Sequence, residues 1–120
     1  MFDHLGLRVK DLAASVRFYQ AALAPLGCVL ASQGEDYAGL GPPGAPGLWL
    51  HAAPAGGPRA GTHVAFKAPN QEAVHAFHAA GLQTGGSDNG APGPRPDYSP
   101  SYYAAFLIDP DGNNVEAVCF

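Results

Sequence analysis

Hydrophobic and polar residues alternate near the start of the chain and then adopt a helical spacing. The run from Leu5 to Val9 is apolar at every second position, which predicts a strand. Asp11 follows as an N-cap, and apolar residues then recur every three or four positions, at Leu12, Val16, Tyr19 and Leu23. This pattern predicts a helix from about residue 12 to about residue 26, which ends at Pro25 and Gly27.

The same pattern returns in the second half of the chain. His63 begins an alternating apolar run as His4 does, and Asn70 takes the place of Asp11 as the N-cap. A second helical stripe then extends to Gly81. The chain therefore contains two copies of one supersecondary unit.

Further strands are expected after each helix. After the first helix they are residues 29–32, 37–40 and 48–52, and after the second they are a weak strand near 83–85, then 102–108 and 114–119. The Gly- and Pro-rich segment 86–101 is expected to be a loop. The sequence thus predicts one α+β domain, residues 1–120, built from two βαβββ modules at about 1–53 and about 62–120, with a linker near 54–61.

Charge and composition exclude several classes of partner. The net charge is −4 and the six Lys and Arg residues are scattered, so we expect no nucleic-acid or anionic-membrane partner. The sequence has no apolar run of membrane-spanning length and no signal-peptide pattern at its start, which predicts a cytoplasmic protein. Cys28 and Cys119 would then be reduced thiols that pack as small hydrophobic residues.

Strand alternation assigns three metal-ligand side chains to one face. If the apolar residues of each strand pack beneath the helix, then His4, His63 and Glu116 point away from it. Two imidazoles and one carboxylate leave coordination positions open, which suits a catalytic metal better than a structural one. The alternative is that each histidine merely ends a strand and forms a local hydrogen bond.

Polar and aromatic residues cluster in and after the Gly- and Pro-rich segment, at Asn89, Arg95, Tyr98, Tyr102 and Tyr103. The segment would act as a lid, Arg95 would bind a substrate carboxylate or phosphate, and Asn89, Tyr98 and Tyr102 are further candidate substrate-binding residues. Tyr103 is the candidate catalytic donor to a metal-bound oxygen, with Tyr102 as the alternative. Alternation allows only one of Tyr102 and Tyr103 to face the cavity. The competing interpretation is that the tyrosines only anchor the loop. A zinc site formed by Glu72, His75 and His78 is disfavoured against an ordinary solvated helix face.

The chain resembles the vicinal oxygen chelate superfamily, which is also called the glyoxalase/bleomycin resistance/dioxygenase superfamily. The resemblance lies in DHLGLRVKDLAASVRFYQAAL, GTHVAFKAP and FLIDPDGNNVEAV, and it extends over essentially the whole chain. It implies paired βαβββ modules that form a curved mixed sheet around a central cavity. It also implies that His4, His63 and Glu116 bind one divalent metal ion (Zn, Fe, Mn or Ni), that Glu116 is also catalytic, and that the protein is a homodimer.

One position departs from the pattern of glyoxalase I. The first module has Trp49 where that enzyme has a second carboxylate, and His51 follows on the same face. This puts methylglyoxal isomerisation in doubt and suggests Trp49 as a substrate-binding residue. His51 is either a replacement ligand or base, or a plain histidine at the edge of a strand.

The leading hypothesis is a metal-dependent enzyme that chelates adjacent oxygens of a small substrate, of lyase or isomerase, thiol transferase or oxygenase type. The alternative is a protein that sequesters an antibiotic or another small molecule, as bleomycin-resistance proteins do. A third possibility is a scaffold with a vestigial cavity. Whether the modules pair within one chain or across a dimer is left open by the sequence.

Overall fold

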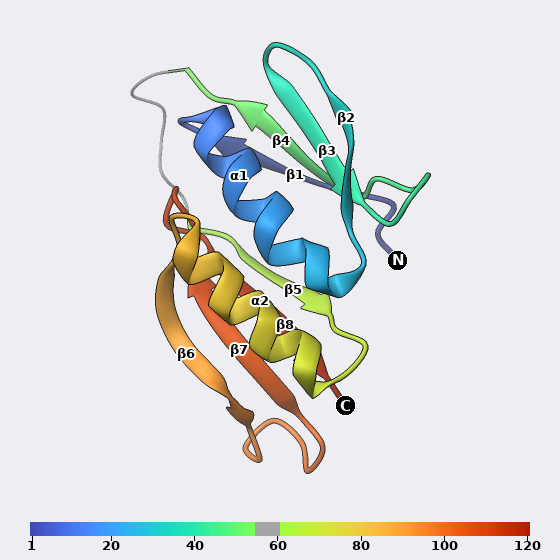
Figure 1. Ribbon diagram of the computed structural model, residues 1–120, viewed down its shortest axis with the longest axis vertical. Helices are drawn as coiled ribbons and strands as arrows, with labels where there is room; N and C mark the ends of the chain where they lie inside the picture. The colour runs from blue at the N-terminus through green and yellow to red at the C-terminus, as the bar shows by residue number, and fades with distance from the viewer. Residues whose placement is uncertain (55–60) are drawn as a thin grey trace.

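The computed structural model describes residues 1–54 and 61–120 and contains two βαβββ modules (Figure 1). The first module consists of β1 (Leu5–Val9), α1 (Leu12–Leu23), a 3₁₀ turn η1 (Ala24–Leu26), β2 (Val29–Gln33), β3 (Tyr37–Gly41) and β4 (Leu48–Ala52). The second consists of β5 (His63–Lys67), α2 (Gln71–Gln83), β6 (Ser87–Pro94), β7 (Tyr103–Ile108) and β8 (Asn114–Cys119). The predicted α+β fold is confirmed. The expected linker falls largely outside the described residues.

Both helices begin at the expected caps. The side chain of Asp11 accepts a hydrogen bond from the amide of Ala14, and that of Asn70 accepts one from the amide of Ala73. The first helix tightens into η1 and stops at Gly27, whose φ of 85° is a left-handed conformation that glycine adopts without strain.

Each module folds its four strands into one sheet with the same strand order. The orders are β1-β4-β3-β2 and β5-β8-β7-β6, and the first and last strands of each module pair in parallel. The two helices lie side by side over one face of the sheets (Figure 1). Alternate strand residues, such as Leu7 and Val9, are buried beneath them in a core shared by both modules. The other face of each sheet carries the candidate site.

The DPDG turn of the second module docks on the first module. Asp109 accepts a hydrogen bond from the hydroxyl of Tyr19 at 2.5 Å, and Asp111 accepts from the amide of Lys10 at 2.8 Å and the hydroxyl of Ser15 at 3.0 Å. Burial raises the pKa of the Tyr19 hydroxyl above its ordinary value, and the neighbouring Asp109 carboxylate raises it further. The DPDG turn therefore holds the two modules of one chain together.

One strand lies later in the chain than predicted. The weak strand expected near 83–85 is absent there because α2 extends to Gln83, and β6 instead occupies Ser87–Pro94, inside the expected loop. Proline and glycine are tolerated in β6 because it is an edge strand, and its pairing with β7 shifts register twice. Turn-like composition thus concealed an irregular edge strand.

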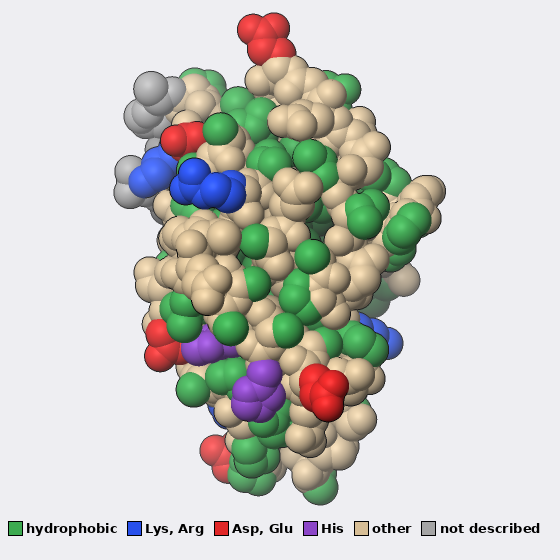
Figure 2. Space-filling model, in the orientation of Figure 1, with side chains coloured by type: hydrophobic (Ala, Val, Ile, Leu, Met, Phe, Trp, Pro, Cys, Tyr) green, Lys and Arg blue, Asp and Glu red, His purple; other side chains and the backbone are tan. Residues whose placement is uncertain are grey.

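Charged side chains are sparse on the helix-covered face of the molecule (Figure 2). Histidine side chains appear over the lower half of this face, where α2 lies (Figures 1 and 2). No helix in residues 1–54 or 61–120 is long and apolar enough to cross a membrane.

Candidate functional site

Glu116 is the centre of the candidate site. It lies on β8, on the face away from the helices, and is only 2% exposed, which is rare for a carboxylate. The strand register places it between Ala65 of β5 and Phe106 of β7. A carboxylate buried this deeply needs partners for both of its oxygens.

His63 supplies the first partner. Its Nε2 lies 3.0 Å from Oε2 of Glu116, and its Nδ1 lies 3.2 Å from the carbonyl oxygen of Asn114. If Nδ1 donates to that carbonyl, a neutral ring presents the lone pair of Nε2 towards Glu116. Two ligand atoms about 2.1 Å from one metal and about 90° apart lie about 3.0 Å from each other. The pair therefore fits two neighbouring positions of a divalent ion.

Tyr102 supplies the second partner. Its hydroxyl donates a hydrogen bond to Oε1 of Glu116. Burial raises the pKa of Tyr102 to about 12, and the adjacent Glu116 carboxylate contributes to the shift. The ring packs edge-on against Tyr98 and Phe120, with centroids 5.0 and 5.3 Å away. Tyr102 thus remains a neutral hydrogen-bond donor at any moderate pH.

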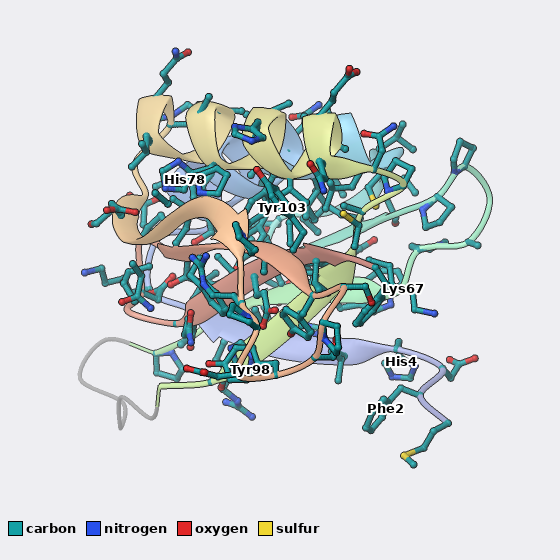
Figure 3. The ribbon with its side chains drawn as sticks, turned by 90° about the horizontal axis from the view of Figure 1, so that it is seen from below. Phe2, His4, Lys67, His78, Tyr98 and Tyr103 are labelled. Carbon is teal, nitrogen blue, oxygen red and sulfur yellow. The ribbon has the colours of Figure 1, made fainter. Side chains whose placement is uncertain are left out.

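The structure places Tyr103, the candidate catalytic tyrosine, on the helix side of the sheet and not beside Glu116. Its hydroxyl lies 2.7 Å from Nε2 of His75 on α2, and Figure 3 shows it between the helices and the sheet. Tyr98 lies on the opposite side of the sheet in the same view. Since neighbouring strand residues point to opposite faces, the contact of Tyr102 with Glu116 places Tyr103 beneath the helix.

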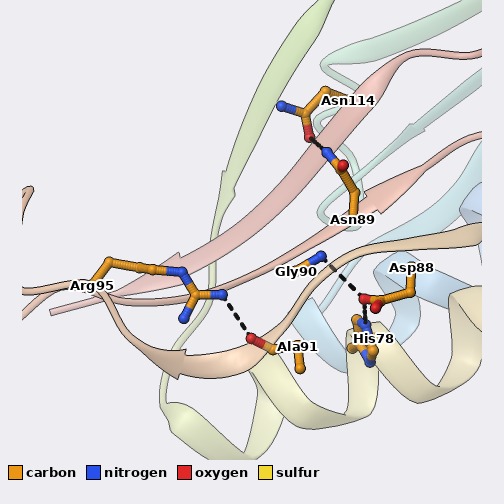
Figure 4. Close-up of polar contacts among 7 residues, drawn as sticks. All are labelled: His78, Asp88, Asn89, Gly90, Ala91, Arg95 and Asn114. Carbon is orange, nitrogen blue, oxygen red and sulfur yellow. Dashed lines mark hydrogen bonds and ion pairs between the residues drawn. The ribbon is translucent and has the colours of Figure 1, made fainter.

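Arg95 and Asn89 lie beside the site without touching Glu116. The guanidinium of Arg95 lies over the ring of Phe106 at 5.5 Å and donates to the carbonyl of Ala91 at 2.7 Å (Figure 4). Asn89 donates to the side chain of Asn114 at 3.1 Å (Figure 4). These contacts cross the open face of β7 and join the β6 segment to β7 and β8.

The sequence interpretation missed Phe106. Its ring stacks on His63 with centroids 6.4 Å apart and also contacts the Arg95 guanidinium, so it lies between these two side chains. Phe106 lies four residues after Tyr102, and alternation puts both on one face. That spacing was the available signal, but the apolar run around Phe106 conceals which face is open.

His4 does not join His63 and Glu116 within one chain. Across residues 1–54 and 61–120, no three His, Cys, Asp or Glu side chains gather closely enough to hold a metal. The His4 side chain is 59% exposed, and its Nδ1 pairs with Asp3 at 2.7 Å. Figure 3 shows it near Lys67, at the end of β5 opposite to His63. The two equivalent histidines thus lie at opposite ends of the junction between the modules.

A hollow of about 220 Å³ adjoins His4 and has mostly apolar walls, including Phe2, Cys28, Leu40 and Phe66. Burial raises the pKa of the Cys28 thiol. The thiol is therefore poorly suited to act as a nucleophile, and it packs as the small hydrophobic residue that we expected.

In the first module, strand register places Trp49 at the position of Glu116. Trp49 pairs with Gly6 of β1 as Glu116 pairs with Ala65 of β5. His51 is exposed two residues further along, and its ring lies above Gly6. The first module thus offers an indole where the second offers a carboxylate.

Comparison with known proteins agrees with this architecture. The family model described as Glyoxalase/Bleomycin resistance protein/Dioxygenase superfamily matches residues 1–117. A glyoxalase/bleomycin resistance protein from Albidiferax ferrireducens T118 is 32% identical, with 98% of this chain and 97% of that chain covered and a TM-score of 0.83. The comparison with curated proteins gave no match.

Two further structures extend this comparison. A family enzyme from Burkholderia phytofirmans PsJN has the same fold at 18% identity and a TM-score of 0.71, with 97% and 95% of the two chains covered. The V278E mutant of glyoxalase I from Zea mays is 29% identical, with 96% of this chain but 44% of that chain covered and a TM-score of 0.72. The paired-βαβββ chain belongs to the Glyoxalase/Bleomycin resistance protein/Dioxygenase superfamily.

Proposed function

We propose that this chain is a metal-dependent enzyme of its superfamily, in which His63 and Glu116 bind one divalent ion. The observation that carries the proposal is the 3.0 Å separation of His63 Nε2 from Oε2 of a buried Glu116. A structural carboxylate gains little from burial on an open sheet face, whereas a metal ligand needs to be held in a fixed position. A proton on Nε2 makes the same contact an ion pair in the metal-free protein.

The third ligand in this proposal is His4 of a second copy. His4 is exposed and lies away from His63, so a homodimer that apposes the first module of one chain to the second module of the other would complete the set. Exposed aromatic residues at both chain ends, Phe2 and Phe120, give such an interface apolar surface to bury. The metal remains Zn, Fe, Mn or Ni.

The chain's own residues would position a small substrate with two adjacent oxygens. A bound divalent ion supplies Lewis-acid polarisation of those oxygens. Tyr102 occupies Oε1 of Glu116 and leaves Oε2 to bind the ion. Trp49 supplies no carboxylate in the first module, so Glu116 is the single carboxylate at these two equivalent positions. This favours thiol transfer or oxygenation over isomerisation that needs a base on each side.

The test is metal content combined with complementation between variants. We expect about one divalent ion per chain, with loss in both His63→Ala and His4→Ala. The two variants should then be mixed and refolded together. Each mixed dimer should regain up to one site, because the His4→Ala chain supplies His63 and Glu116 and the His63→Ala chain supplies His4. His75→Ala, outside the site, is the matched control. Unchanged metal content in His63→Ala would refute the proposal, and no recovery on mixing would refute the shared site.

Sequestration of a small molecule is the second candidate. The observation that favours it is the aromatic cluster of Tyr98, Tyr102 and Phe120 on the open face, in which Tyr98 is 65% exposed and Phe120 is 73% exposed. If the purified protein carries no metal but still binds a small molecule tightly, that result would favour sequestration over metal-dependent catalysis.

A further inference from the structure

A buried chain of hydrogen bonds runs from the first module to the residue before His63. The hydroxyl of Tyr19 on α1 donates to Oδ2 of Asp109 at 2.5 Å, and Nδ2 of Asn113 donates to the same oxygen at 2.9 Å. On its other side, Oδ1 of Asn113 accepts from the amide of Thr62 at 3.0 Å. Tyr19, Asp109 and Asn113 are 0%, 3% and 4% exposed. The chain of bonds therefore lies in the interior until it reaches Thr62.

The side chain of Asn113 is not needed to close the turn in which it lies. Its backbone already pairs with Asp109, because the Asp109 amide donates to the Asn113 carbonyl at 2.9 Å and the Asn113 amide donates to Oδ1 of Asp109 at 2.8 Å. The amide side chain instead joins two segments that are 51 residues apart in the sequence. It donates on one side and accepts on the other, and it places no second charge beside the Asp109 carboxylate. Buried polar groups that are fully paired in this way make their surroundings rigid.

The backbone of Thr62 is held on both sides, and His63 follows it directly. The Thr62 amide donates to Asn113, and the Thr62 carbonyl accepts from the amide of Asn114 at 2.9 Å. His63 is the first residue of β5, and strand ends open more readily than strand centres. The carbonyl of Asn114 also lies 3.2 Å from Nδ1 of His63. The backbone and the ring of His63 are thus both held by residues at the start of β8.

We propose that Asn113 is a positioning residue for the metal site, which holds His63 in front of Glu116 and couples it to the packing of α1. The proposal deepens the proposed function and rests on it for the metal alone. A histidine ligand binds well when its ring is already oriented, and groups that orient such ligands typically change metal affinity about 10–100-fold. Tyr19 and Asp109 act at one remove, since they hold Asn113 against the first module.

The test compares Asn113→Ala with Asp111→Ala, in the metal-free full chain and in titrations with Zn²⁺. Asp111 lies in the same turn and also joins the modules, but its side-chain oxygens accept from the first module and are not part of this chain of bonds. We expect Asn113→Ala to speed hydrogen exchange of the Thr62 amide, to shift the NMR signals of the His63 ring and to weaken Zn²⁺ binding about 10–100-fold. Asp111→Ala should lose stability but keep all three properties at their wild-type values.

Two results would overturn the proposal. One is a folded Asn113→Ala protein in which either the Zn²⁺ affinity or the His63 ring signals remain those of wild type. The other is an equal loss of Zn²⁺ affinity in Asp111→Ala, because the effect would then follow from general destabilisation. If the wild type binds no Zn²⁺, the proposed function fails, and the signals of Thr62 and His63 still decide whether Asn113 positions His63.

Tyr19→Phe tests the far end of the same chain and replaces Asn113→Ala if that variant does not fold. It removes one hydroxyl and keeps the packed ring, so the first module should stay intact. The signals of Thr62 and His63 should move in this variant, and Zn²⁺ binding should weaken less than in Asn113→Ala. Unmoved signals and an unchanged Zn²⁺ affinity in Tyr19→Phe would overturn the coupling to α1.

Discussion

At the scale of single residues, the site depends on how the two oxygens of Glu116 are divided. Tyr102 takes Oε1 and His63 faces Oε2, so a carboxylate that is 2% exposed has a partner on each side. Tyr102 contacts Glu116 from the same side of the sheet as Phe106, whereas Tyr103 bonds to His75 beneath the helix. One step along a strand thus separates a site residue from a packing residue.

A second carboxylate gives a prediction for the pH dependence of stability. The hydrogen bond from His78, at 2.8 Å, and a second from the amide of Gly90 lower the pKa of Asp88 below its ordinary 3.8 (Figure 4). The stabilisation is therefore present above pH 3.8 and is lost as the pH falls through the lower folded-state pKa. Asp88→Asn should unfold more easily than wild type at neutral pH in urea titrations, and the difference should vanish in acid. A constant difference at all pH values would contradict this.

At the scale of elements, close contact between α2 and its neighbours determines how the modules pack. Gly81 of α2 is buried, and a Cβ there would lie 2.3 Å from Cδ1 of Leu107 on β7 and 3.2 Å from the ring of Phe18 on α1. A glycine inside a helix lowers stability, so a glycine at this position indicates that the packing leaves no room for a Cβ atom.

Gly81→Ala should therefore destabilise the fold although alanine is the better helix former. Overpacking costs about 1–3 kcal/mol and helix propensity returns up to about 1 kcal/mol, so we expect a net loss of about 1 kcal/mol. Chemical denaturation measures the change. The control is Ala76→Gly at an exposed position of α2, where propensity alone should cost about 1 kcal/mol. A more stable Gly81→Ala protein would contradict this prediction and would show that the Leu107 side chain moves aside at little energetic cost.

At the scale of the whole molecule, polar contacts of the DPDG turn join the modules across 90 or more residues of sequence. Asp109 and Asp111 together accept bonds from Lys10, Ser15 and Tyr19 of the first module. The turn therefore does more than reverse the chain between β7 and β8, because it also determines where α1 begins relative to the second sheet.

Asp111→Ala should lower the free energy of unfolding by about 2–3 kcal/mol, because it removes hydrogen bonds between a carboxylate and two donors of the other module. Glu35→Ala, in the exposed turn before β3, is the matched control and should change stability little. Thermal and urea unfolding both measure the loss. Equal stability of the two variants would mean that the helix interface alone joins the modules.

Much of the secondary structure was predictable because its signals are local. The caps at Asp11 and Asn70, the alternation in β1 and β5, and the stop at Gly27 each depend on residues a few positions apart. The strand β6 was misplaced because its Gly and Pro residues carry a turn signal, and only pairing with β7 makes the segment a strand. The relation of Trp49 to Glu116 also followed from the repeat, since equivalent strands have equivalent registers.

What the sequence determined by itself is therefore the pair of modules and the face of the sheet on which His63, Glu116 and Trp49 lie, because strand alternation and the repeat are properties of neighbouring residues. The tertiary structure alone decided that His63 meets Glu116, that Tyr102 rather than Tyr103 joins them, and that His4 lies apart. These contacts, and the distance of His4 from the others, depend on how the two helices and the DPDG turn pack the modules together. No pattern within either module encodes that packing.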